Sequence, residues 1–353
     1  AAARRRAIAW PAIRFGVIAA IAGLVVWRVD WGALQNAFQL HSWGFVVVAV
    51  AANFASVLLK GLGWKGVVDA LPAVGRRTRL IDLVSPLLIG FLFNTILAAR
   101  VGEIAKALLL RRRLLRRGAD VSVTALLGTV VAENLVSTLA WVALVIGIGA
   151  FLPLPLYAWT ASVVLGVVCL SVVVVALMRS PGRQMPPWLG SGPIWARATR
   201  ALVRLWGAVR ESHLGLRDPR QMGQVAGACL ASWVAQWAGI YCVLVAFGLD
   251  HVGWGGAGLL LVTVTLAQAF PVLPGNLVIF QAAAVLPLTA SYGVSAADAI
   301  AFSIVLQVTE AIVGVAIGFL FLCAEGVRFD QLRRAAEREG AADPPQEALA
   351  PDG

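Results

Sequence analysis

The stretch "FNTILAARVGEIAK" (residues 93–106) places Arg100, Glu103 and Lys106 inside apolar sequence, with "LVSPLLIGFL" before it and "ALLL" after it. An ionisable residue inside a bilayer costs roughly 2.5–3.5 kcal/mol on insertion scales, so a functional role is the first hypothesis for each one. The stretch therefore raises two questions, which are whether the chain spans a membrane and why charges would lie there.

The composition answers the first question. The 353 residues are 60% hydrophobic and 13% charged, and the mean hydropathy is +0.84. Soluble domains are roughly 45–50% apolar and roughly 25% charged. Several runs exceed the roughly 18 apolar residues of a transmembrane helix. We predict an all-α, polytopic membrane protein with apolar segments at about 12–28, 43–63, 82–110, 121–150, 156–178, 223–248, 255–290 and 299–323.

The net charge of +11 gathers in loops that alternate along the chain with loops of few basic residues. By the positive-inside rule this alternation predicts membrane topology rather than nucleic-acid binding. We expect a plasma (inner) membrane protein of the cell envelope with both termini in the cytoplasm. The basic clusters assigned to that side are Arg4–Arg6, Lys65–Arg79, Arg111–Arg117, Arg179–Arg220 and Arg328–Arg338.

Two apolar segments do not fit a single crossing. Residues 82–110 have basic clusters at both ends, and residues 255–290 are too long for one helix and contain "FPVLPGNLVIF". We predict two re-entrant hairpins, which turn near 94–100 and 271–276. A weak repeat pairs Glu103 with Gln281 and Glu133 with Glu310, which favours two inverted repeats as in many transporters.

The predicted organisation is one transmembrane domain over 1–327, with halves at about 43–150 and 223–323. Between them, residues 179–222 read as a cytoplasmic linker with an amphipathic helix suited to the headgroup plane. The tail, 328–353, is predicted to be disordered. The sequence has no metal-ligand cluster, P-loop or GxSxG motif, so we expect no cofactor, no metal and no enzyme activity.

The buried charges have competing interpretations. Arg100 suits a phosphate, because a guanidinium binds phosphate oxygens in a fork. Glu103, with Glu133 and Glu310, suits an ammonium group on the same lipid. The alternative is that Arg100 and Glu103 form a structural ion pair. We interpret Lys60 and Lys106 as side chains that extend to the membrane surface.

The motifs resemble those of a known family. "NTILAARVGEIAKALLLRRR" (94–113) resembles the N-x-x-L-P-x-R-x-G-E signature of the lysylphosphatidylglycerol synthase transmembrane-region family, also called flippase-like. "FPVLPGNLVIFQAA" (270–283) resembles its second signature, P-G-x-x-G-x-x-E. The resemblance covers about residues 10–325. Four positions depart from the usual Pro, Gly, Glu and Arg of the family: Ala98, Val278, Gln281 and Asn134.

The resemblance implies a lipid flippase. Its partner would be a phospholipid or a polyprenyl-phosphate lipid, and a separate lipid-modifying enzyme would make that lipid. The motifs and the polar positions together predict a substrate site of Asn94, Arg100, Glu103, Glu133, Pro274, Gly275, Asn276, Gln281, Gln307 and Glu310, with Gly102 and Gly275 as hinges.

Two other functions fit part of the pattern. A membrane enzyme or accessory subunit of lipid-linked glycan synthesis would use Glu103 and Glu133 as an acid/base pair. A scaffold for a partner enzyme would explain the amphipathic linker, but it would not explain charges inside the apolar segments.

Overall fold

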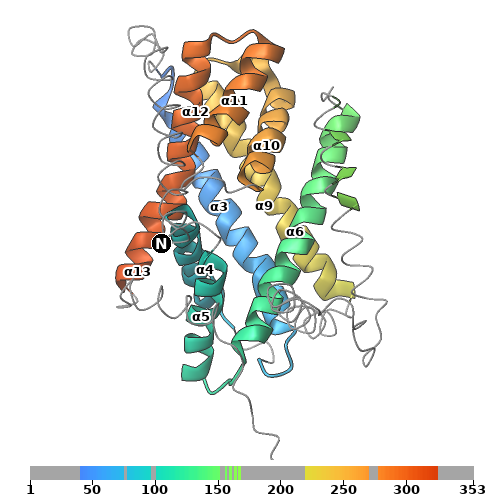
Figure 1. Cartoon of the computed structure of the whole chain (residues 1–353), viewed down its shortest axis with the longest axis vertical. Helices are drawn as coiled ribbons and strands as arrows, with labels where there is room; N and C mark the ends of the chain where they lie inside the picture. Colours follow the sequence, from blue (N-terminus) through green and yellow to red (C-terminus); the bar gives the residue numbers. More distant parts are fainter. Residues whose placement is uncertain are drawn as a thin grey trace, which may run out of the picture.

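The computed structural model describes residues 40–74, 78–96, 101–151, 219–269 and 277–324, and a few positions between 156 and 167. Every regular element in these ranges is helical (Figure 1). The predicted segment 12–28, the linker 179–222 and the tail 328–353 lie almost wholly outside the described residues, as does most of the segment 156–178.

Four helices are long and apolar enough to cross a membrane, which confirms the all-α, multi-pass prediction. They have 27–29 residues, or about 40 Å at about 1.5 Å per residue, against a hydrocarbon core of about 30 Å. The fourth is continuous over Ala296–Ala324 and consists of α12 (Ala296–Ala311), the π-helical η4 (Ile312–Ile317) and α13 (Gly318–Ala324). The other three are α3 (Trp43–Asp69), α6 (Val123–Phe151) and α9 (Pro219–Ala246).

The segments that did not fit a single crossing are each divided into two shorter helices. The first comprises α4 (Leu80–Ile96) and α5 (Val101–Arg116), and the second comprises α10 (Gly253–Ala269), after the short η2 (Asp250–Val252), and α11 (Leu277–Tyr292). At 16 or 17 residues, each helix is about 25 Å long, shorter than the hydrocarbon core. The α4–α5 pair lies toward one end of the bundle and the α10–α11 pair toward the other (Figure 1).

The helices of the first pair are antiparallel. Asp82 near the start of α4 forms an ion pair with Arg117 just beyond α5, while Asn94 near the end of α4 bonds to Glu103 in the first turn of α5. In the second pair, Gly256 near the start of α10 lies beside Tyr292 at the end of α11. Each interrupted segment therefore turns back along itself between its two helices.

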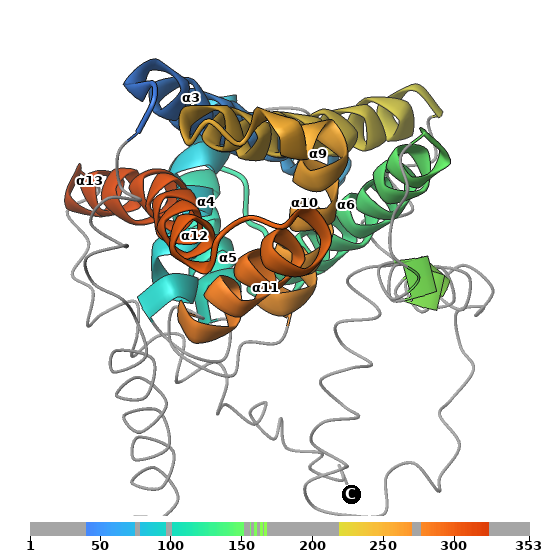
Figure 2. The ribbon, with the colours of Figure 1, turned by 90° about the horizontal axis from the view of Figure 1, so that it is seen from above.

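The long helices α3 and α9 form the most extensive contact in the bundle and cross antiparallel (Figure 2). Ser56 Oγ and Ser232 Oγ are 2.9 Å apart, and Gln221 Nε2 donates to the Gly66 carbonyl oxygen at 2.8 Å. Gly63 of α3 faces the thiol of Cys229. Small residues at such a crossing allow the two backbones to approach closely, as is common between membrane helices.

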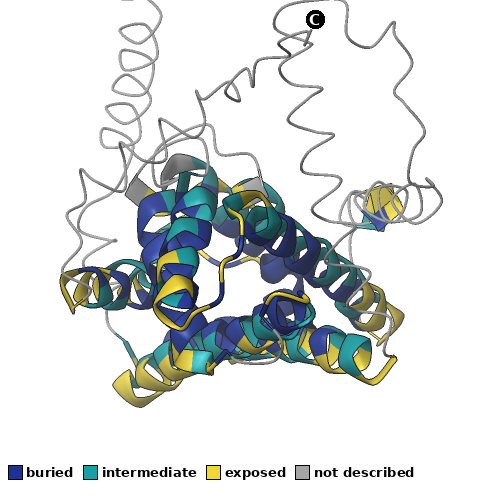
Figure 3. Cartoon of the chain, turned by 90° about the horizontal axis from the view of Figure 1, so that it is seen from below, coloured by how far each residue is buried: buried dark blue, intermediate teal, exposed yellow. Residues whose placement is uncertain are grey.

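Buried residues face the interior of the bundle, whereas exposed residues lie on its outer faces and ends (Figure 3). One apolar core gathers around Trp64 and Leu83 from α3 and α4, and another around Phe280 and Phe302 from α11 and α12. Large apolar side chains such as Leu320 are exposed. An apolar exterior is expected where lipid surrounds the protein.

Candidate functional site

Asn94, on α4, caps the beginning of the neighbouring helix α5. The Gly102 N–H donates to Asn94 Oδ1 at 2.8 Å, and Asn94 Nδ2 donates to Glu103 Oε1 at 3.0 Å. The first N–H groups of a helix have no partner within the helix, so an oxygen from α4 satisfies one of them here. Glu103 is thereby held in the first turn, where the helix dipole favours a negative charge.

Two glycines bring the backbones of α4 and α5 into contact. A Cβ atom added at Gly102 would lie 2.0 Å from the Gly90 carbonyl oxygen and 2.5 Å from Asn94 Oδ1. Gly102 therefore serves close packing of the two helices in this structure. Its predicted role as a hinge stays a prediction.

Lys106 lies inside the protein, where the sequence had suggested an extended side chain at the surface. Its side chain is 2% exposed, and its Nζ donates to Glu103 Oε2 at 2.8 Å and lies 5.1 Å from the centre of the Phe91 ring. A Cβ atom added at Gly90 would lie 2.5 Å from Lys106 Cγ. The expectation for Lys106 is wrong because Gly90, on the other helix, leaves the space that its aliphatic chain fills.

A second ion pair joins α3 to α6. Lys60 Nζ lies 3.6 Å from Glu133 Oε1, and the Glu133 side chain is 2% exposed. Lys60 is therefore paired inside the bundle as well. Glu133 is also close enough to Glu103 and Lys106 to interact with both electrostatically. We call Lys60, Glu103, Lys106 and Glu133 the charged cluster; with two residues of each sign, its formal charge is zero.

The second half of the chain carries a different polar group. Gln281 Nε2 of α11 donates to Gln307 Oε1 of α12 at 2.6 Å, and Gln268 Nε2 of α10 donates to Glu310 Oε2 at 3.1 Å. Gln236 of α9 is also hydrogen-bonded to Glu310. We call these five residues the carboxamide group. Residues 221–327 contain neither Lys nor Arg, so no basic residue of its own half balances Glu310.

The π-helical turn η4 begins two residues after Glu310. A Cβ atom at Gly314 would touch Phe91, and one at Gly318 would lie 2.6 Å from the Leu88 carbonyl oxygen, so both glycines face α4. Single π-helical turns inside α-helices are frequent at functional sites. Here the turn lies between the carboxamide group and the α4–α5 pair, which places the two halves in direct contact.

One buried carboxylate oxygen at each site makes no hydrogen bond within the described ranges, although Glu133 Oε1 has Lys60 Nζ at 3.6 Å as an ion-pair partner. Among the described residues, Glu133 Oε1 and Glu310 Oε1 are buried and make no hydrogen bond. A buried carboxylate oxygen without a hydrogen bond is costly, so each marks a place where a hydrogen-bond donor would bind favourably. In the same ranges, no group of three His, Cys, Asp or Glu residues is arranged to hold a metal ion.

The sequence matches the family described as "Lysylphosphatidylglycerol synthase TM region" over residues 12–318. The chain belongs to this family. Membership associates it with membrane lipid and with the modification of phosphatidylglycerol. A comparison with curated proteins gives no match, and a comparison with solved structures gives none either.

The structure brings some predicted residues of this family member together and separates others. Asn94, Gly102 and Glu103 meet at the start of α5, and Gln281 meets Gln307 between α11 and α12. Glu133 and Glu310 belong to different polar groups. The remaining predicted residues lie outside the described ranges: Arg100, Pro274, Gly275 and Asn276.

The sequence analysis missed Lys60 and Lys106 as partners of the predicted carboxylates, and it missed Gln268. A usable signal existed for Lys106, because Gly90 is a small residue on the neighbouring limb of the same interrupted segment. Gln268 is the last polar residue of α10 before the break between α10 and α11. Nothing in its position along the sequence indicates that Glu310 is its partner.

Proposed function

We propose that this protein moves a phosphate-containing lipid headgroup, aminoacylated or polyprenyl-linked, between the leaflets of the membrane. The charged cluster carries the proposal. It holds four ionisable side chains among apolar helices, where each is costly, and it lies beside an interrupted segment. A headgroup that crosses about 30 Å of hydrocarbon loses its hydration, and paired charges that exchange partners can replace the lost water.

The architecture that we propose for this function is a pair of inverted repeats, each with a re-entrant hairpin. Its support is the match between the two halves: α3, α4, α5 and α6 have 27, 17, 16 and 29 residues, and α9, α10, α11 and the Ala296–Ala324 helix have 28, 17, 16 and 29. The antiparallel crossing of α3 and α9, and the location of the short pairs toward opposite ends, agree with this symmetry.

In the proposed mechanism, the headgroup displaces the internal ion pairs. Its phosphate binds Lys106 and Arg100, and any ammonium group binds Glu103, Glu133 or Glu310. Gln281 and Gln307 orient the polar part, while the acyl chains stay in lipid. The two short helix pairs separate in turn, toward one leaflet and then the other, by movement at Gly102 and Gly275. Asn94 releases or restores the cap of α5 as this happens.

The test is headgroup translocation in proteoliposomes that contain the full chain and a panel of aminoacylated, zwitterionic, anionic and polyprenyl-phosphate lipids. An impermeant reagent that modifies exposed headgroups measures their movement. We expect one lipid class to move with the wild type and movement to be lost with Arg100→Ala and with Lys106→Met. Arg79→Gln is the matched control, since Arg79 is an exposed cation outside the charged cluster.

Mass spectrometry of the extracted lipids separates the alternatives. Wild-type movement by folded Arg100→Ala and Lys106→Met proteins would refute the proposed site. Conversion of a supplied lipid into another compound, without movement, would favour the membrane enzyme or accessory subunit. Neither movement nor conversion would favour the scaffold.

A further inference from the structure

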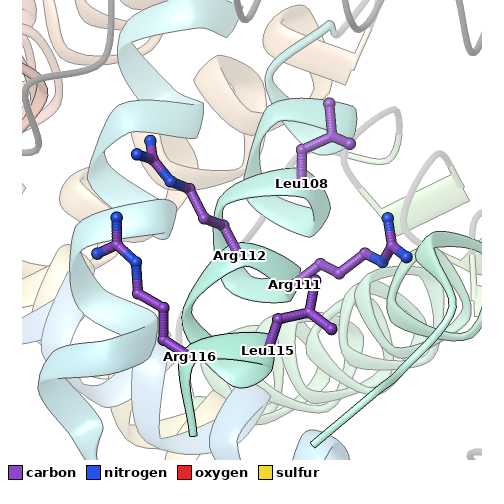
Figure 4. Close-up of a pocket in the computed structure, with 5 residues that line it drawn as sticks. All are labelled: Leu108, Arg111, Arg112, Leu115 and Arg116. Carbon is purple, nitrogen blue, oxygen red and sulfur yellow. The ribbon is translucent and has the colours of Figure 1, made fainter. Parts of the chain in front are cut away.

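The last two turns of α5 carry a basic face that is distinct from the charged cluster. An open pocket of about 430 Å³ lies on this face and is lined by Leu108, Arg111, Arg112, Leu115 and Arg116 (Figure 4). Four of these residues, at positions 108, 112, 115 and 116, follow helical spacing and share one side of α5. Lys106 and Leu110, which are buried, lie on the opposite side.

The arginines at the end of α5 differ in their partners. Arg111 Nε donates to the Val121 carbonyl oxygen at 3.1 Å, Arg113 Nη1 donates to the Ile81 carbonyl oxygen at 2.8 Å, and Arg117 pairs with Asp82. Within the described ranges, Arg112 and Arg116 have neither a hydrogen bond nor an ion pair. Both extend toward the same side, whereas Arg111 points away (Figure 4).

The apolar part of this face suggests what kind of anion binds. Leu115 is 44% exposed, lies between the two arginines in the sequence and lines the same pocket. A soluble anion would neutralise the arginines and leave the leucines uncovered. A lipid would cover both, because its headgroup and its acyl chain are joined in one molecule.

We propose that Arg112 and Arg116 bind the phosphate of an anionic phospholipid of the surrounding bilayer, with an acyl chain along Leu108 and Leu115. Guanidinium groups bind phosphate oxygens through paired N–H donors, and basic groups near the membrane surface favour anionic lipids. This lipid is a resident of the outer face of α5 and is separate from any lipid that passes the charged cluster.

The experiment measures lipid binding to the full chain in detergent by native mass spectrometry, with phosphatidylglycerol and phosphatidylcholine of equal chain length. Each arginine near a membrane surface adds roughly five-fold to the affinity for an anionic lipid. We therefore expect Arg112→Gln and Arg116→Gln each to weaken phosphatidylglycerol binding about five-fold and the double variant about twenty-five-fold. Replacement of both by Lys should give a smaller loss, since the charge remains and the fork is lost.

The matched control is Arg79→Gln, which removes an exposed cation at the start of α4 and should leave phosphatidylglycerol binding unchanged. Circular dichroism and size-exclusion chromatography establish that each variant is folded. Wild-type binding by the folded double variant would overturn the proposal, as would an equal loss in Arg79→Gln. Complete competition by millimolar glycerol 3-phosphate would also overturn it, because the site would then recognise a soluble phosphate.

Discussion

The two halves of the molecule have helices of nearly equal length and polar groups of different chemistry. In the first half one ion pair joins α3 to α6 and another lies within α5, and Asn94 of α4 donates to the Glu103 carboxylate of α5. The second half joins α9, α10, α11 and α12 through amides and one carboxylate. Hydrogen bonds to charged groups contribute about 1.5–3 kcal/mol each, and neutral ones about 0.5–1.5 kcal/mol. We expect the α4–α5 pair to be held more strongly than the α10–α11 pair.

Backbone packing adds to this difference. Gly90 and Gly102 let α4 and α5 touch, and the Asn94 cap ties the two helices at the same place. In the described part of the second pair, α10 and α11 meet through side chains such as Tyr292 against Gly256. We therefore expect the α10–α11 pair to open before the α4–α5 pair. Substitutions in the two halves test this expectation through the free energy of unfolding.

The largest effect should come from Lys106→Met. Removal of one partner of a buried ion pair costs about 3–5 kcal/mol, and because the remaining Glu103 carboxylate is 25% exposed we expect the lower end of that range. Denaturant unfolding in mixed micelles measures the free energy. The control is Lys106→Met combined with Glu103→Gln, which should lose much less stability than the sum of the two single losses, because the two side chains are coupled. A single variant as stable as the wild type would contradict the role of the pair.

Gly102→Ala should follow, with a loss of about 1–3 kcal/mol from overpacking. The added methyl group would overlap the Gly90 carbonyl oxygen, so α4 and α5 must separate. Gly147→Ala is the matched control, because nothing lies within 4 Å of a Cβ atom there. Thermal unfolding of both variants should show a lower midpoint for Gly102→Ala alone, and equal midpoints would count against the close helix contact.

Gln307→Leu should cost about 1 kcal/mol, since it removes a neutral hydrogen bond and leaves Gln281 without that partner. Unfolding under the conditions used for Lys106→Met allows a direct comparison of the two halves. The double substitution Gln281→Leu with Gln307→Leu should be nearer the wild type. A loss as large as that of Lys106→Met would show that polar contacts stabilise the two halves equally, which would contradict the expected difference.

Ser56→Ala should have the smallest effect, about 0.6 kcal/mol, which is the average for side-chain hydrogen bonds between membrane helices. Ser56 and Ser232 share one hydrogen bond at the crossing of the halves. Ser232→Ala should therefore cost the same, and the double variant no more than either single one. Additive losses in the double-mutant cycle would show that the two hydroxyls act independently.

Much of the fold could be predicted from the sequence. Apolar run length predicts long membrane helices. The basic clusters at both ends of 82–110, and the length and prolines of 255–290, predict two interrupted segments. In each of these segments one described helix ends and another begins. These features depend on neighbouring residues in one chain segment, which is why a linear pattern reveals them. The signatures around Asn94 and Pro274 also indicated the family, which the match over residues 12–318 confirms.

The partners of the polar residues could not be predicted in the same way. We expected Lys106 at the membrane surface because it lies near the cytoplasmic end of its apolar segment, where a lysine side chain can extend to the headgroups. Only the tertiary structure sets Gly90 beside it, which opens the space for the buried side chain. Glu310 has partners from α9 and α10 that lie more than 40 residues away in sequence.

The linear pattern of residues was therefore enough to predict the membrane environment, the approximate apolar segments, the two interruptions and the family. Hydrophobic free energy sums along the chain, so composition alone decides which segments lie in lipid. The tertiary structure decided which charges neutralise each other and where two backbones touch. Electrostatic and packing energies depend on distances between side chains of different helices, and these distances exist only once the helices have packed.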